Sequence, residues 1–84
     1  MTFTARVVTI CPGDARPYDP EEWSGALVGV ARGEVELECP GGGRARFGRG
    51  DLLWLAPLAL SALRNPGPEA VVLVVVSKVG GGDR

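Results

Sequence analysis

The chain of 84 residues contains no histidine and no glutamine, and it has one lysine, one asparagine and two cysteines. Without histidine, the chain lacks both the usual base for a serine or cysteine nucleophile and any imidazole ligand for a transition metal. Two cysteines do not build a disulfide framework, and no Cys-x-x-Cys pair indicates a zinc site. These absences exclude the commonest catalytic and metal-binding arrangements.

Charge of one sign and long apolar runs are scarce as well. The net charge is −1 with the signs mixed, which gives no electrostatic argument for nucleic acid or for an anionic membrane surface. The longest apolar run, residues 70–76, is far shorter than the roughly 20 residues that span a bilayer. The N-terminus lacks the basic start and apolar stretch of a signal peptide. We therefore expect a cytoplasmic protein with neither nucleic acid nor membrane as a partner.

Short apolar or alternating stretches, separated by glycine and proline turns, fill the chain. They are predicted strands at residues 2–10, 25–32, 34–39, 44–47, 52–55, 59–64 and 70–79. Residues 15–24 hold two prolines and are expected to be an extended loop anchored by Trp23. The pattern predicts an all-β barrel or sandwich with no helix of any length, forming a single domain over residues 1–79 with a flexible tail at 80–84.

The stretch from residue 34 to residue 47 predicts a hairpin with a defined register. Pairing Glu36 with Arg46 and Glu38 with Arg44 sets opposite charges across from each other on one face. The same register places apolar pairs on the inner face, Val35 with Phe47 and Leu37 with Ala45, and Cys39 is expected on that face too. A slip of one residue would set carboxylates against apolar side chains, so the charges specify the pairing.

The spacing between Gly50 and Asn65 resembles the second half of the cupin signature. That signature places a proline, a glycine and a metal-binding histidine between its first glycine and its last asparagine. Here the proline is displaced by one position to Pro57, and Leu58 and Ser61 occupy the glycine and histidine positions. The resemblance implies a double-stranded β-helix (jelly-roll, cupin-like) barrel of seven to nine short antiparallel strands.

The first half of the signature aligns when Gly33 is taken as its closing glycine. Ala26 then stands where the metal-binding glutamate belongs. The two histidine positions fall on Pro20 and Glu22 or, with the longer spacing, on Asp19 and Glu21. Because all four ligands of the family are replaced, the resemblance implies a barrel without its metal centre, and we expect neither a metal nor another cofactor.

Four groups of residues leave alternatives open. Asp19, Glu21 and Glu22 form either a substitute site for a hard cation or a solvated acidic loop, and we favour the loop. Ser61 lacks a base and is expected to be a small polar residue pointing into the barrel. Each cysteine, Cys11 or Cys39, is either a redox-active thiol or a small half-buried residue before a turn, and we favour the second. Trp23 and Trp54 form either a pocket wall or ordinary core packing, which we favour.

Two predicted strands, within residues 52–55 and 70–76, are apolar on both faces. One face belongs to the core, so the other should meet a second subunit or be covered by the N-terminal strand. We therefore expect a homodimer with an isologous, largely apolar interface.

The function that these observations favour is a non-catalytic cupin-like module, with no catalytic residue assigned. It would bind a small apolar or sugar-like ligand in the barrel, or act purely as an interaction domain, filled with side chains. The residues expected to line the barrel interior are Glu22, Ala26, Val28, Trp54 and Ser61. The alternative is a small cupin enzyme, of isomerase, epimerase or dioxygenase type, using carboxylates or a non-standard metal site.

Overall fold

The computed structural model describes residues 2–55 and 58–79, and within these it contains eight strands and one short helix. The elements are β1 (Thr2–Ile10), β2 (Ala15–Pro17), α1 (Pro20–Trp23), β3 (Ala26–Arg32), β4 (Glu34–Glu38), β5 (Arg44–Gly48), β6 (Leu52–Trp54), β7 (Ala62–Arg64) and β8 (Val71–Val79). The predicted all-β fold of seven to nine strands is confirmed. Pro57 and the predicted tail at 80–84 lie outside the described residues, so the domain boundary at residue 79 stays a prediction.

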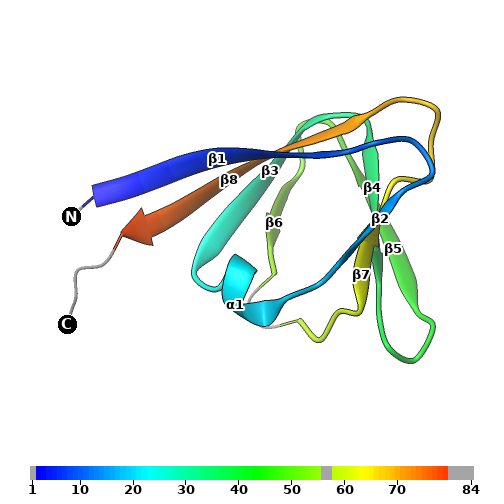
Figure 1. Cartoon of the computed structure of the whole chain (residues 1–84), viewed down its shortest axis with the longest axis horizontal. Helices are drawn as coiled ribbons and strands as arrows, with labels where there is room; N and C mark the ends of the chain where they lie inside the picture. Colours follow the sequence, from blue (N-terminus) through cyan, green and yellow to red (C-terminus); the bar gives the residue numbers. More distant parts are fainter. Residues whose placement is uncertain (1, 56–57, 80–84) are drawn as a thin grey trace.

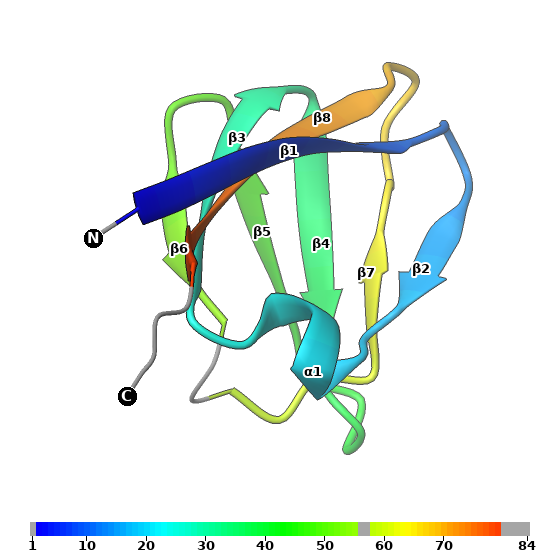
Figure 2. The ribbon, with the colours of Figure 1, turned by 60° about the vertical axis from the view of Figure 1, so that its left-hand side comes forward.

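Two antiparallel four-stranded sheets face each other and enclose the core (Figures 1 and 2). Sheet A has the strand order β1–β8–β3–β6 and sheet B the order β2–β7–β4–β5. Alternate residues of each strand point into the core, as the two-residue period of a strand requires. Fully or almost fully buried residues come from both sheets: Val28, Leu53, Leu73 and Val75 from sheet A, and Val35, Leu37 and Leu63 from sheet B.

The predicted hairpin has the register that its charges indicated. β4 and β5 pair with Glu36 opposite Arg46 and Glu38 opposite Arg44. Val35 and Leu37 are buried on the inner face as expected, whereas Cys39 follows the end of β4 and is exposed. The strand predicted at 34–39 therefore ends one residue earlier, at Glu38.

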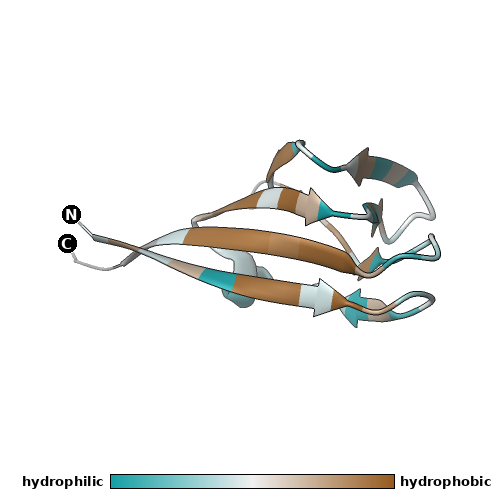
Figure 3. Cartoon of the chain, turned by 90° about the horizontal axis from the view of Figure 1, so that it is seen from above, coloured by the Kyte–Doolittle hydropathy of each residue, from teal (hydrophilic) through white to brown (hydrophobic). Residues whose placement is uncertain are grey.

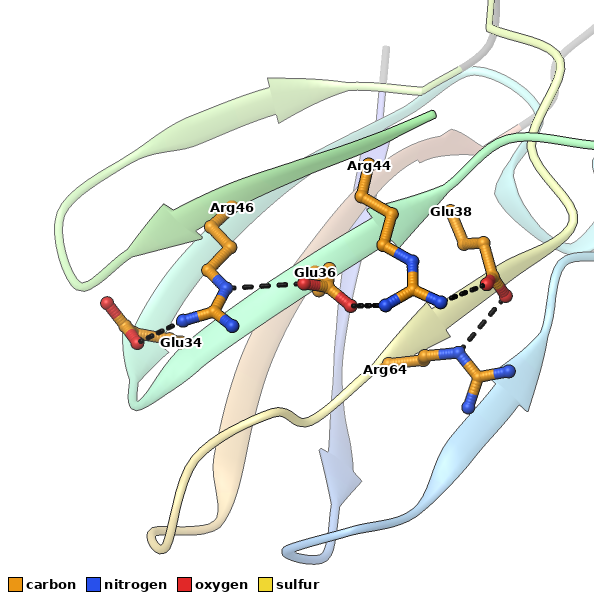
Figure 4. Close-up of polar contacts among 6 residues, drawn as sticks. All are labelled: Glu34, Glu36, Glu38, Arg44, Arg46 and Arg64. Atoms are coloured by element: carbon orange, nitrogen blue, oxygen red, sulfur yellow. Dashed lines mark hydrogen bonds and ion pairs between the residues drawn. The ribbon is translucent and has the colours of Figure 1, made fainter. Parts of the chain in front are cut away.

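Charged side chains form a continuous ladder on the outer face of sheet B, over β4, β5 and β7 (Figure 4). Glu36 lies between Arg46, whose Nε is 3.2 Å from it, and Arg44, whose Nη1 is 3.7 Å from it. Glu38 accepts from Arg44 at 3.3 Å and from Arg64 at 3.0 Å. The arginines of the ladder are exposed, whereas Glu36 is buried. Ion pairs at a protein surface each contribute only about 0–1 kcal/mol, so the ladder's larger effect is to specify register.

The segment at residues 15–24 differs from the predicted extended loop. Residues 15–17 form β2, and residues 20–23 form the one-turn helix α1. Pro20 is the first residue of that helix, where its missing N–H costs no hydrogen bond. The Asp19 carboxylate caps the helix by accepting from the Glu21 amide at 3.0 Å. The prediction of no helix is wrong here, but Trp23 is fully buried, as an anchor should be.

Three further expectations need correction. The strand predicted at 59–64 begins only at Ala62. Both cysteines are exposed rather than half-buried. The N-terminal strand does not cover the outer face of β8; instead β1 pairs alongside β8 from Thr2 to Ile10 and widens the same sheet. Within the described part of the chain, no helix has the length and apolar character needed to cross a membrane.

The turn at Gly33, between β3 and β4, lies close to the backbone of Ala70, just before β8. Gly33 has φ +72°, and a Cβ placed there would lie 2.7 Å from the Ala70 carbonyl oxygen. Gly13 has a similar φ of +81°, but a Cβ there would meet nothing within 4 Å. A side chain at either glycine would strain the backbone, because both have a positive φ. Only at Gly33 would the side chain also overlap neighbouring atoms.

We predict that Gly13→Ala lowers the free energy of unfolding by about 1–2 kcal/mol, the cost of a left-handed backbone for an L residue. Gly33→Ala should lose a further 1–3 kcal/mol or so, because the methyl group overlaps backbone that cannot move freely. Urea unfolding of the two variants measures the difference. Equal losses would contradict the close approach at Gly33.

Candidate functional site

The five residues expected to line the barrel interior do not form one site. Ala26 and Val28 are completely buried in the core, so neither is accessible to solvent. Ser61 is exposed, and its hydroxyl donates to the Glu38 carbonyl at 3.0 Å. Trp54 is 52% exposed, on the outer face of sheet A, so the prediction that it points inward is wrong. Whether any of these residues binds a ligand stays a prediction.

Glu22 has a structural position between β1, β2 and α1. Its carboxylate makes a close hydrogen bond with the Arg16 guanidinium and lies 3.5 Å from that of Arg6. Arg6 also donates to the Glu22 carbonyl at 3.3 Å and lies over the Trp23 ring, 5.2 Å from its centroid. The charges of Arg6 and Arg16 therefore compensate the Glu22 carboxylate. The cation–π contact of Arg6 connects this group of charges to the buried Trp23.

The positions that would hold a metal in a cupin do not offer a matching set of donors. Ala26 has no donor atom, and Ser61 is bonded to the backbone of Glu38. Asp19 caps α1, and Glu22 faces two arginines. Across residues 2–55 and 58–79, no group of three or more His, Cys, Asp or Glu side chains is placed to hold an ion. The family's metal centre does not fit this set of residues.

An apolar hollow of about 470 Å³ lies instead beside the β4–β5 hairpin and the loop that follows residue 57. Its lining is Leu37, Cys39, Gly43, Arg44, Ala45, Phe47, Leu58, Ala59 and Leu60. The hollow adjoins β5, which is the edge strand of sheet B among the residues that the structure describes. As a result Ala45 is exposed and Phe47 is only half-buried, although both belong to the inner face of the hairpin.

A second hollow, of about 440 Å³, lies at the other end of β4 and has a different chemical character. It is lined by Arg32, Gly33, Glu34, Arg49, Gly67, Pro68 and Glu69. Two guanidinium groups and two carboxylates make the charge of its lining balanced, so it does not favour an ion of either sign.

Only part of the lining of the apolar hollow can be predicted from the sequence. The alternation in the hairpin correctly placed Leu37, Ala45 and Phe47 on one face. The residues at 58–60 were expected to lie partly in a strand, yet they form a loop against that face. No local pattern distinguishes a loop residue that lines a hollow from one that points into water.

Comparisons with known proteins identify the fold. No protein-family model matches the chain, and no curated protein matches it. Among solved structures it resembles a Cupin 2 conserved barrel domain protein from Salinispora arenicola CNS-205, with a TM-score of 0.67 and 22% sequence identity. The match covers 88% of this chain and 60% of that one, so the chain corresponds to less than two thirds of the other protein. The chain therefore has the cupin-like barrel fold that its sequence resemblance implied.

Asn65, one of the two residues in register with the cupin signature, has a structural role. It is buried, and its Nδ2 donates to the Ile10 carbonyl at 2.9 Å and to the Glu69 carbonyl at 2.7 Å. Its Oδ1 accepts from the Gly67 amide at 3.0 Å. These three bonds connect the end of β1 to the turn that leads into β8.

We predict that Asn65→Ala lowers the free energy of unfolding by about 2–4 kcal/mol, because buried backbone groups lose their partners. The control is Ser61→Ala, which removes a single exposed hydrogen bond to Glu38 and should cost less than about 1 kcal/mol. Denaturant unfolding measures both variants. A loss for Asn65→Ala no larger than that of the control would contradict the assigned role.

Proposed function

We propose that the chain is a non-catalytic cupin-like module that binds a small apolar molecule in the hollow beside the β4–β5 hairpin. The observation that carries this proposal is the position and chemistry of the hollow. It opens at the edge of the barrel, next to the inner face of β5, and its volume of about 470 Å³ lies in the range of small-molecule sites.

The lining favours an apolar ligand over a sugar-like one. Leu37, Leu58, Leu60 and the half-buried ring of Phe47 supply most of the contact surface. A sugar needs several convergent hydrogen-bonding side chains around it, whereas here Arg44 already pairs with Glu36 and Glu38 on the outer face. When a hydrocarbon group binds there, the apolar surfaces of both the ligand and the hollow are removed from water, and no buried polar group is left unpaired.

The same lining supports a binding role rather than catalysis. Of the described residues around the hollow, the ionisable ones are Cys39 and Arg44, and no Asp or Glu is among them. The acidic residues on which an isomerase or epimerase would depend, Asp19 and Glu22, are engaged in a helix cap and in ion pairs. General acid–base chemistry requires such a group within hydrogen-bond reach of the ligand.

The test is a titration with indole, a small neutral aromatic probe, followed by ¹⁵N NMR of the backbone amides. We predict shifts confined to residues such as Ala45, Phe47 and Leu60. Ala45→Asp places a carboxylate in the apolar hollow without disturbing the core, because Ala45 is exposed. It should weaken indole binding by about tenfold or more, since the ligand would have to desolvate that charge.

Ala15→Asp is the matched control, because Ala15 is also an exposed strand residue but lies on β2, away from the hollow. Its affinity for indole should equal that of the unmodified chain. Equal binding by the Ala45→Asp variant, or shifts that map elsewhere, would contradict the proposed site. Stoichiometric manganese, iron or nickel in the purified protein would contradict the non-catalytic part of the proposal.

A further inference from the structure

The outer face of sheet A is apolar across all four of its strands. The register aligns two complete rows of side chains on this face. One row runs Ala5, Val76, Leu27, Trp54. The next runs Val7, Val74, Gly29, Leu52. In Figure 3 the strand that leads to the C-terminus, β8, is hydrophobic along most of its length and is flanked by largely hydrophobic stretches of its neighbours.

Large side chains on this face are widely exposed to solvent. They are Phe3 (60%), Val7 (65%), Leu27 (41%), Leu52 (70%) and Trp54 (52%). If full exposure of a large apolar side chain is about 200 Å², these five present roughly 600 Å² before the half-buried valines of β8 are added. Monomeric proteins seldom expose a larger patch, and about 800 Å² per partner is the size of a standard stable interface.

Nothing else in the described chain covers this face. β1 lies within the sheet, and α1 directs Trp23 into the core on the opposite side. Residues 80–84, Gly-Gly-Gly-Asp-Arg, offer no apolar side chain for the purpose. The described residues therefore leave this face without a cover.

We propose that the outer faces of sheet A from two copies of this chain pack against each other. The two rows contain no charged residue, and Arg6 of β1 is turned to the opposite side of the sheet, where it contacts Glu22. The charged residues in register with this face lie beyond the two rows, Arg32 opposite Val72 at one end and Lys78 opposite Phe3 at the other. The two charge-free rows are complementary to themselves, because two copies can meet along them without opposing like charges or burying an unpaired one. A partner with a charged surface would instead lose its hydration without gaining any ion pair.

Sheet B shows why this face, and not the other, is the interface. Its outer face carries the ladder of Glu36, Glu38, Arg44, Arg46 and Arg64, which is internally paired and has exposed arginines (Figure 4). The outer face of sheet A is therefore apolar, whereas that of sheet B is charged, so only the first would gain free energy by leaving water. Face-to-face packing of two sheets at about 10 Å would bury the apolar rows and leave both ladders in water.

The test is the mass in solution, measured by size-exclusion chromatography with light scattering. The unmodified chain should elute at twice its mass of 8.8 kDa. Val7→Lys on β1 and Leu52→Lys on β6 introduce a charge at opposite edges of the face, and each should weaken association by about 100-fold or more. Because both residues are exposed in the single chain, circular dichroism of the variants should remain that of a folded β protein.

Thr4→Lys is the matched control, since Thr4 is an exposed residue of the same strand that points to the opposite face. This variant should remain a dimer. A monomeric unmodified chain at about 100 µM would overturn the proposal. A dimer that survives both Val7→Lys and Leu52→Lys would overturn it as well, because the copies would then meet elsewhere, for instance along the free edge of β1.

Discussion

The structure depends on a strand that is apolar on both faces and lies inside a sheet with only one face in the core. Val71, Leu73 and Val75 of β8 are fully buried between the two sheets. Val72, Val74 and Val76 alternate with them and face outward. Burial of the first set holds the fold together, and the second set leaves an outer surface that water solvates poorly.

A small chain also limits what its interior can do. A domain of 84 residues buries only about 60–65% of the surface that its unfolded chain exposes, so each core position matters to stability. Here Trp23, Ala26 and Val28 are completely buried side chains of the core. A cavity at that place would cost stability in proportion to its volume. The apolar hollow lies at the edge strand β5, where the core ends.

Sequence reasoning succeeded where two local signals agreed. For the hairpin of β4 and β5, charge pairing and apolar alternation selected the same register, and Glu36 does lie opposite Arg46. The resemblance around Gly50 and Asn65 gave the fold because those residues have backbone roles: Gly50 has φ +96°, and Asn65 bridges two turns. Such roles persist when the metal ligands between them are replaced.

The prediction was wrong where the sequence pattern does not distinguish the two faces of a strand. The run at residues 52–55 is apolar throughout, so the sequence cannot say which side of the strand Trp54 occupies. The pairing of Leu53 with Val28 in the core decides it and turns Trp54 outward. The prediction of a loop at 20–23 is wrong because proline, which disrupts the interior of a helix, is well tolerated at the first position of one. The hollow could not be predicted because it depends on the position of β5 at the edge of sheet B, which is a tertiary property.

The most direct measurement of how the outer face of sheet A is covered is acrylamide quenching of the two tryptophans as the protein is diluted. Trp23 is fully buried in the single chain, whereas Trp54 is half-exposed on that face, so only Trp54 reports on association. If two copies pack face to face, quenching should be weak at about 100 µM and should increase only on dilution below the dissociation constant. Strong quenching of one tryptophan even at the highest concentration would contradict a covered face.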